Sequence, residues 1–206
     1  SAQWETLGLE FDCIYTGFFA NGAQIDFARR FIERFAKDDT LILADPVLGD
    51  NGALYGCFGP EQVEKMRQLC RMAHVITPNR TEAALLAGLP ADTPAEELLA
   101  ALRAQLEVEN TIVTGVCREN EIGYLARLGE REMSLQYPRV AQTLHGTGDV
   151  FAAALCGALL SCGEAPAALR QAAEFCNACV EKTAQRQPAH WYGLAFEDVL
   201  KERSGL

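Results

Sequence analysis

Positive charge is scarce in this sequence of 206 residues. It has 18 Lys and Arg against 28 Asp and Glu, so the formal net charge is −10. Proteins that bind nucleic acids or membrane surfaces need basic patches, so the shortage of Lys and Arg argues against both classes of protein. It does not argue against a nucleotide site, where metal ions and local backbone dipoles meet the phosphates.

Long apolar runs are also lacking. No run reaches the length of a membrane span, and the first five residues lack the charged and apolar regions of a signal peptide. A P-loop is missing as well, because Gly-Lys followed by Ser or Thr occurs nowhere in the chain. The sequence therefore does not predict a transmembrane protein or a P-loop NTPase.

Cysteine, by contrast, is plentiful, and its placement indicates a reducing compartment. The cysteines lie mostly within apolar runs rather than in a framework of loops, which favours free thiols and a cytoplasmic location. Cys176 and Cys179 form a C-x-x-C, but without a second such pair we expect helix packing rather than a zinc site. The eight cysteines are Cys13, Cys57, Cys70, Cys117, Cys156, Cys162, Cys176 and Cys179.

Apolar β-rich runs alternate with helix-period segments along the whole chain. Strands are predicted over residues 11–17, 41–44, 74–77 and 111–115, and a hairpin over 122–128 and 133–140. Helices are predicted over residues 24–37, 60–72, 80–86, 94–106, 150–161, 164–183 and 196–201. This alternation predicts an α/β fold in one domain: a mostly parallel central sheet with helices on both faces and an antiparallel hairpin near one edge.

Polar residues follow the predicted strands at the points where the strands end. In order along the chain they are residues 16–17, 45–50, 79–82 and 114–115. Open sheets of this kind bind ligands beyond the carboxyl ends of their strands. The shared position of these four clusters therefore predicts a ligand site at that edge of the sheet.

Two of these clusters contain carboxylates suited to a metal ion. Asp45 and Asp50 lie five residues apart on one loop. They can hold Mg²⁺ directly or through its waters, or they can form a turn that uses Asp, Asn and Gly for their backbone habits. Asn79 and Glu82 have the spacing of a capping box, and Glu82 can also orient a water of the ion.

The stretch Gly146-Thr147-Gly148-Asp149 precedes an almost entirely apolar run. Glycines let N–H groups approach an anion, and a helix start adds unpaired N–H groups and a positive dipole end. A carboxylate beside such a phosphate site suits a base that takes a proton from an attacking hydroxyl. The four residues alone are more typical of a turn before a capped helix, and Phe151 excludes a dinucleotide fingerprint.

Two further groups are less specific. His145, next to this stretch, can touch a phosphate but is more typical of a partly exposed loop histidine. Residues 190–192, with the sequence His-Trp-Tyr, are more typical of a packed terminal segment than of an aromatic lid over a base.

Taken together, the clusters resemble the ribokinase-like superfamily and, within it, the pyridoxal kinase family. The residues that carry the resemblance are 15–18 (Tyr-Thr-Gly-Phe), 45–50, 77–82 and 146–149. The resemblance implies ATP-dependent phosphorylation of the 5′-hydroxymethyl group of vitamin B6 vitamers, namely pyridoxal, pyridoxine and pyridoxamine. It also implies Mg²⁺, leaves a monovalent-cation requirement open, and suggests a homodimer.

The resemblance implies a role for each residue of the loop before the apolar run. Asp149 would be the base on the substrate hydroxyl. The N–H groups of Gly146, Thr147 and Gly148 would hold the phosphoryl group that is transferred.

The strand-end clusters take the remaining roles by the same resemblance. Asp50, Asn79 and Glu82 would surround the phosphates, with Asp50 and Glu82 at the metal. Thr114 and Gly115 would lie near the nucleotide.

The same resemblance points to two aromatic residues at the substrate. Phe18 matches a position beside the pyridine ring, and Tyr55 matches a tyrosine near the substrate.

The sequence differs from the family at its N-terminus. In family members, a strand with substrate-binding polar residues and a lid-forming region come before the part that matches residues 1–17 of this chain. The given sequence contains neither of them. A start at Ser1, without Met, fits a trimmed or truncated product. The alternatives are a hydroxymethylpyrimidine kinase or sugar kinase of the same superfamily, and a non-catalytic ligand-binding remnant.

Overall fold

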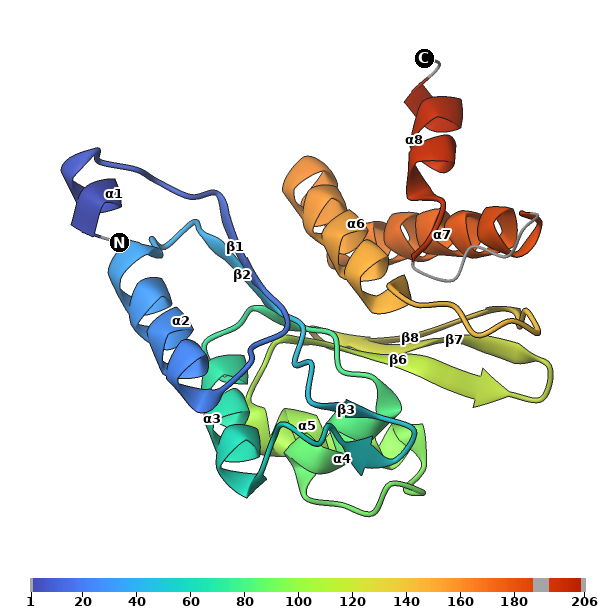
Figure 1. Cartoon of the computed structure of the whole chain (residues 1–206), viewed down its shortest axis with the longest axis horizontal. Helices are drawn as coiled ribbons and strands as arrows, with labels where there is room; N and C mark the ends of the chain where they lie inside the picture. The colour runs from blue at the N-terminus through green and yellow to red at the C-terminus, as the bar shows by residue number, and fades with distance from the viewer. Residues whose placement is uncertain (1, 187–192, 205–206) are drawn as a thin grey trace. The chain divides into compact units, whose positions relative to one another are not determined.

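The computed structural model describes residues 2–186 and 193–204 and divides into two compact units (Figure 1). The first unit comprises residues 1–114 and 125–132, and the second comprises 115–124 and 133–206. Residues 190–192 lie outside the described residues. The sequence predicts a single domain, and that remains a proposal.

One six-stranded sheet runs in the order β1-β2-β5-β6-β7-β8. The pairs β1–β2, β2–β5 and β5–β6 are parallel. The strands are β1 Cys13–Thr16, β2 Leu41–Ala44, β5 Val75–Ile76, β6 Asn110–Arg118, β7 Glu121–Leu128 and β8 Arg131–Pro138. A mostly parallel sheet accompanied by helices confirms the predicted fold class.

The predicted hairpin is present, with a tighter turn than expected. Gly129 and Glu130 alone separate β7 from β8, whereas the sequence predicts a turn of four residues. The predicted fourth strand also continues to Arg118 and reaches β7 through Glu119 and Asn120. Because two residues cannot make a parallel crossover, both connections join antiparallel neighbours.

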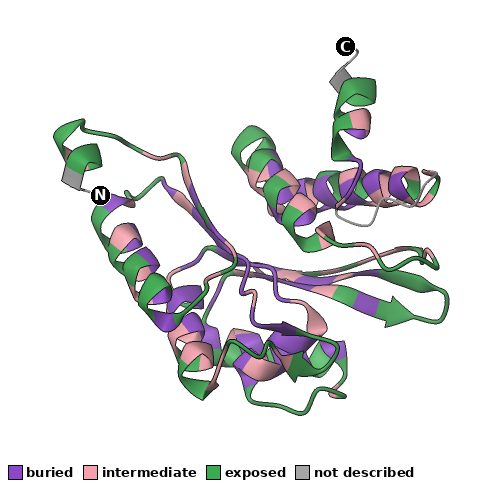
Figure 2. Cartoon of the chain, viewed as in Figure 1, coloured by how far each residue is buried: buried purple, intermediate pink, exposed green. Residues whose placement is uncertain are grey.

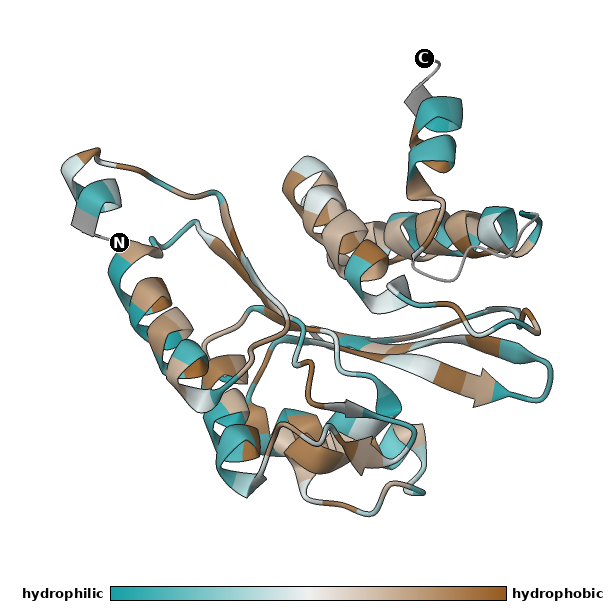
Figure 3. Cartoon of the chain, in the orientation of Figure 1, coloured by the Kyte–Doolittle hydropathy of each residue, from teal (hydrophilic) through white to brown (hydrophobic). Residues whose placement is uncertain are grey.

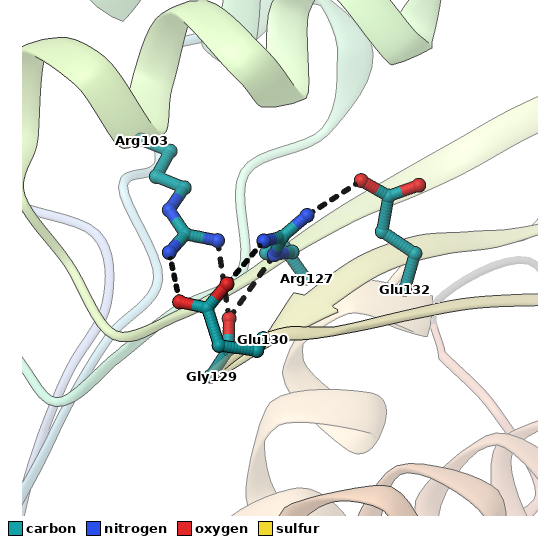
Figure 4. A network of polar contacts seen from close by, with 5 residues as sticks. All are labelled: Arg103, Arg127, Gly129, Glu130 and Glu132. Atoms are coloured by element: carbon teal, nitrogen blue, oxygen red, sulfur yellow. Dashed lines mark hydrogen bonds and ion pairs between the residues drawn. The ribbon is translucent and has the colours of Figure 1, made fainter.

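A polar network holds the β7–β8 turn against helix α5, Ala95–Leu106 (Figure 4). Arg103 and Arg127 both donate to the Gly129 carbonyl oxygen, at 3.2 and 3.1 Å. Both also pair with the Glu130 carboxylate, and Arg127 reaches Glu132 at 2.8 Å. Since Glu132 belongs to β8, Arg127 thereby joins the turn to the strand that follows it.

Five helices belong to the first unit: α1 Ala2–Thr6, α2 Gly22–Phe35, α3 Pro60–Cys70, α4 Arg80–Ala87 and α5 Ala95–Leu106. Helix α2 shows why the predicted spacing works, since its apolar positions Ile25, Ala28 and Ile32 are buried, whereas its polar positions are exposed or half-buried (Figure 2). Asn21 caps it by accepting from the Gln24 N–H group. The short α1 was not predicted.

The second unit contains α6 Thr147–Cys162, α7 Ala165–Ala184 and α8 Phe196–Ser204. Helix α6 is apolar along most of its length (Figure 3). Small residues at buried positions of α7, among them Ala172, Ala173 and Cys176, leave room for close helix packing. Within the described residues, no helix is both long and apolar enough to cross a membrane.

Candidate functional site

The carboxyl ends of the parallel strands in the first unit gather polar residues, as the sequence predicts. The Asp45 N–H group donates to the Thr16 carbonyl oxygen at 2.8 Å, which joins the ends of β1 and β2. The Thr77 hydroxyl, after β5, donates to the Asp45 carboxylate at 3.2 Å. Asp45 is buried, so its carboxylate serves this junction rather than the surface.

A small hairpin presents Asp50, the candidate metal ligand. It consists of β3 Gly49–Asp50 and β4 Ala53–Leu54, joined by Asn51 and Gly52. Both turn residues have positive φ, 53° and 80°, as a type I′ turn requires. Asn-Gly is the strongest short-range sequence signal for such a turn, but the predicted elements include only a loop or turn here and no hairpin.

The close approach of the two strands explains the glycine that precedes Asp50. A Cβ at Gly49 would lie 2.2 Å from the Ala53 carbonyl oxygen across the hairpin. Asp50 itself is exposed. Its two carboxylate oxygens accept from the N–H group and the side-chain amide of Asn51, at 2.8 and 3.1 Å.

The first turn of α4 forms the capping box that the spacing of Asn79 and Glu82 predicts. The Asn79 side chain accepts from the Glu82 N–H group at 2.9 Å, and Glu82 Oε2 accepts from the Asn79 N–H group at 2.8 Å. Two donors at the helix start are thereby satisfied reciprocally.

Glu82 is buried at 3% exposure, and both of its oxygens accept backbone N–H groups. Its second partner is the Leu48 N–H group, at 3.2 Å. Burial raises the pKa of Glu82 to about 8, and the charge of Asp45 adds to this, whereas the backbone hydrogen bonds lower it. Glu82 thus anchors the segment that leads into the β3–β4 hairpin.

The same turn of α4 bonds the hairpin itself. The Asn79 side-chain amide donates to the Gly49 carbonyl oxygen at 2.9 Å, and the Thr81 hydroxyl accepts from the Gly52 N–H group at 2.9 Å. Thr81 lies in the predicted polar cluster 79–82, but the sequence predicts no role for it, because a threonine inside a helix carries no motif of its own.

Thr114 joins this arrangement through the backbone. It forms a parallel bridge with Asn79, and its N–H group donates to the Pro78 carbonyl oxygen at 2.9 Å. Gly115 follows with φ 69°, and both residues lie within β6 rather than at the end of a strand, where the sequence predicts them. The prediction was wrong here because the strand continues to Arg118. The structure nevertheless brings together Asp50, Asn79, Glu82 and Thr114, from three separate stretches of the first unit.

The two aromatic candidates also lie in the first unit. Phe18 is 60% exposed, and its ring centroid lies 5.8 Å from that of Phe58. Tyr55 is 39% exposed, and its N–H group donates to the Leu48 carbonyl oxygen at 2.9 Å. Both residues are therefore exposed, and Tyr55 directly follows the β3–β4 hairpin that carries Asp50.

The second unit holds the Gly146–Asp149 stretch at the start of α6. Gly146 is the N-cap residue, with φ 81° and ψ 10°, and no side chain caps the helix. The first turn, with the N–H groups of Thr147, Gly148 and Asp149, begins an uncapped helix of 16 residues. Asp149 and His145 are exposed.

Packing behind this turn fixes its position within the second unit. Phe151, 2% exposed, stacks on Tyr124 with ring centroids 4.4 Å apart. The Cys176 thiol donates to the Thr147 carbonyl oxygen at 3.5 Å. Burial raises the pKa of Cys176 to about 11, so it is a neutral donor here.

The fit to a magnesium ion depends on Asp50. No group of three or more His, Cys, Asp or Glu side chains is placed to hold a metal ion within residues 2–186 and 193–204. Mg²⁺ usually keeps several waters and takes only one or two protein carboxylates together with substrate phosphates. An exposed Asp50 fits that pattern, whereas direct ligation by Glu82 would break its hydrogen bonds to backbone N–H groups.

Comparison with known proteins gives consistent matches. Residues 1–193 match the family described as phosphomethylpyrimidine kinase. A candidate phosphomethylpyrimidine kinase from Bacteroides thetaiotaomicron, crystallised with pyridoxal, is 35% identical with a TM-score of 0.89, over 98% of this chain and 74% of that one. Pyridoxal kinase from Lactobacillus plantarum is 31% identical with a TM-score of 0.87, over 99% and 76%.

Curated sequences agree with these structures. The pyridoxine/pyridoxal/pyridoxamine kinase of Bordetella avium is 29% identical over 157 residues, which cover 72% of this chain and 52% of that protein. The chain spans about half the length of this protein and of two Schizosaccharomyces pombe relatives.

Proposed function

The chain belongs to the phosphomethylpyrimidine kinase family, and from that membership we propose that it phosphorylates vitamin B6 vitamers. The reaction transfers the γ-phosphoryl group of ATP to the 5′-hydroxymethyl group of pyridoxal, pyridoxine or pyridoxamine. Relatives named as pyridoxal and pyridoxine kinases support this substrate class, as does the relative that was crystallised with pyridoxal.

The start of α6 carries the proposal. Its uncapped N–H groups, at Gly146, Thr147 and Gly148, suit the charge on a phosphoryl group that is being transferred. Asp149 adds an exposed carboxylate in the same turn. In the proposed mechanism Asp149 accepts the proton of the hydroxymethyl group while the oxygen attacks phosphorus in line.

The first unit supplies the proposed metal and nucleotide groups. Asp50 would hold Mg²⁺, directly or through waters, and the ion would offset charge on the phosphates. Asn79 and Glu82 would keep the loop that carries Asp50 in place, through the bonds described above. Thr114 and Gly115 would lie near the nucleotide.

Two aromatic residues would receive the vitamer ring. Phe18 and Tyr55 both expose ring surface, which suits stacking or edge contact with a pyridine. We propose that the protein is a homodimer located in the cytoplasm. The cytoplasmic location is proposed because free thiols fit a reducing compartment. The dimer and any monovalent cation follow from the family resemblance.

A second candidate substrate is a hydroxymethylpyrimidine, because the matched family is described as phosphomethylpyrimidine kinase. A panel of vitamers, hydroxymethylpyrimidine and ribose, each offered with ATP and Mg²⁺, separates the candidates by mass spectrometry of the products. We expect phosphorylated B6 vitamer. If only the hydroxymethylpyrimidine or only ribose is phosphorylated, the vitamer assignment is contradicted. If calorimetry shows that a vitamer or ATP binds but no product forms, the protein is a non-catalytic remnant.

A further inference from the structure

The β3–β4 hairpin depends for its position on the first turn of α4. Three side chains of that turn each make a hydrogen bond to the backbone of residues 48–52, and Thr81 is the one that reaches the turn of the hairpin. Thr81 is buried at 7% exposure, so its hydroxyl is held in place rather than free to rotate into solvent.

We propose that Thr81 is a positioning residue that fixes the Asp50 carboxylate for Mg²⁺, an inference that rests on the proposed kinase function. The hydroxyl oxygen of Thr81 accepts from Gly52 at 2.9 Å. Gly52 follows Asn51, and both are in the left-handed region that the hairpin turn requires. A hydrogen bond to Gly52 therefore holds the turn in the conformation that presents Asp50.

Asn51 completes the connection to the carboxylate. Its N–H group and its side-chain amide bond the two oxygens of Asp50, at 2.8 and 3.1 Å. If the turn rotates, Asn51 moves and both of these bonds change together. The orientation of Asp50 is thus coupled to Thr81 through two adjacent residues, with no direct contact needed.

The size of the effect follows from a single hydrogen bond. A net hydrogen bond is worth about 1 kcal/mol, which corresponds to a change of about 3- to 10-fold in an equilibrium constant. Thr81→Val removes the acceptor and keeps the shape, whereas Thr81→Ser keeps the acceptor. We expect Thr81→Val to weaken metal binding by about 3- to 10-fold and Thr81→Ser to change it less than twofold.

The matched control is Thr40→Val in the same unit. Thr40 is buried, and its hydroxyl accepts from the Lys37 N–H group at 3.0 Å and donates to the Phe11 carbonyl oxygen at 2.9 Å, so the substitution removes two hydrogen bonds away from the hairpin. Its expected effect is a loss of stability with unchanged metal binding.

The experiment measures Mn²⁺ binding in the presence of ADP by electron paramagnetic resonance. Amide exchange of Gly52 by NMR accompanies it, and both readouts are independent of turnover. Each Thr81 variant is also made with Asp50→Asn, and the Mg²⁺ concentration that gives half-maximal phosphorylation is compared. The proposal predicts faster Gly52 exchange and weaker metal binding in Thr81→Val, and no further weakening when Asp50 is already Asn.

Unchanged metal binding in Thr81→Val would overturn the proposal. An equal weakening of metal binding in Thr40→Val would also overturn it, and so would a further weakening when Thr81→Val is combined with Asp50→Asn. If Thr81→Val does not fold, Thr81→Ala removes the same acceptor without placing a second methyl group against the turn. If the wild-type protein forms no phosphorylated vitamer, the proposed function fails, while metal binding and Gly52 exchange still decide the role of Thr81.

Discussion

Glu82 shows at the residue scale how one side chain serves both structure and the site. Its burial and its two backbone donors make it an anchor for the segment that precedes Asp50. The capping-box spacing with Asn79 was readable from the sequence. The bond to the Leu48 N–H group was not, because it joins residues 34 positions apart that only the fold brings together.

The raised pKa of Glu82 predicts a pH dependence of stability. Its ordinary value is 4.5 and its folded-state value is about 8, so the folded protein holds an extra proton between these pH values. The free energy of unfolding therefore contains a Glu82 contribution that falls as pH rises from about 4.5 to 8. Glu82→Gln should remove that contribution.

Urea unfolding at pH 5 and pH 8 measures this difference. We expect the free energy of unfolding to decrease less with pH in Glu82→Gln than in the wild type, by on the order of a few kcal/mol. The comparison uses slopes, because glutamine also loses an acceptor for one of the N–H groups. Parallel pH profiles would show that Glu82 is not protonated near neutral pH.

Helix α6 illustrates the element scale. Its two ends carry glycines in the left-handed region, Gly146 with φ 81° and Gly163 with φ 69°. The apolar run that forms the helix was predicted from sequence, and the structure adds the uncapped N-terminus. The β3–β4 hairpin was missed because strands of two residues carry no periodicity, although Asn51-Gly52 signalled it.

The two glycines give a matched pair of variants. Gly146→Ala and Gly163→Ala meet no atom within 4 Å, so each suffers mainly the backbone penalty of about 1–2 kcal/mol. We expect similar losses in melting temperature, but only Gly146→Ala should raise the KM for ATP, because we propose that only that end binds phosphate. Equal KM values in both variants would contradict phosphate binding by this turn.

At the scale of the whole molecule, the eight thiols divide by burial. Cys57, Cys117 and Cys162 are exposed, whereas Cys70, Cys176 and Cys179 are buried. Burial raises the pKa of Cys176 to about 11 and that of Cys179 to about 12. We therefore expect the C-x-x-C pair to react slowly, in line with its predicted packing role.

Reaction with a thiol reagent at pH 8 tests this division. We expect three thiols to react rapidly in the native protein and all eight in denaturant. Replacing Cys57, Cys117 and Cys162 by Ser should abolish the rapid phase. A rapid phase that persists would contradict this division, because it would come from the half-buried Cys13 and Cys156 or from buried thiols that become exposed in solution.

The order of elements and the fold class were predictable from the whole sequence. Apolar runs with helical or strand spacing predict seven of the helices and the four parallel strands. They do so because burying one face of a helix or strand requires apolar residues at the helical or strand period. Strand ends and turn lengths shifted by a few residues, as at Gly129 and Glu130. Contacts such as that of Thr81 with Gly52 depend on tertiary geometry and leave no periodic pattern.

The central claim concerns Asp149 as the base in vitamer phosphorylation. Its most direct test is the kcat of ATP-dependent pyridoxal phosphorylation by Asp149→Asn, with Glu164→Gln as a control. Glu164 is also exposed and lies at the N-terminus of α7, so the control removes a charge from another helix start. We predict a fall in kcat of about 10²–10⁴-fold in Asp149→Asn, with ATP binding largely intact and Glu164→Gln unchanged. A wild-type kcat in Asp149→Asn would contradict the account.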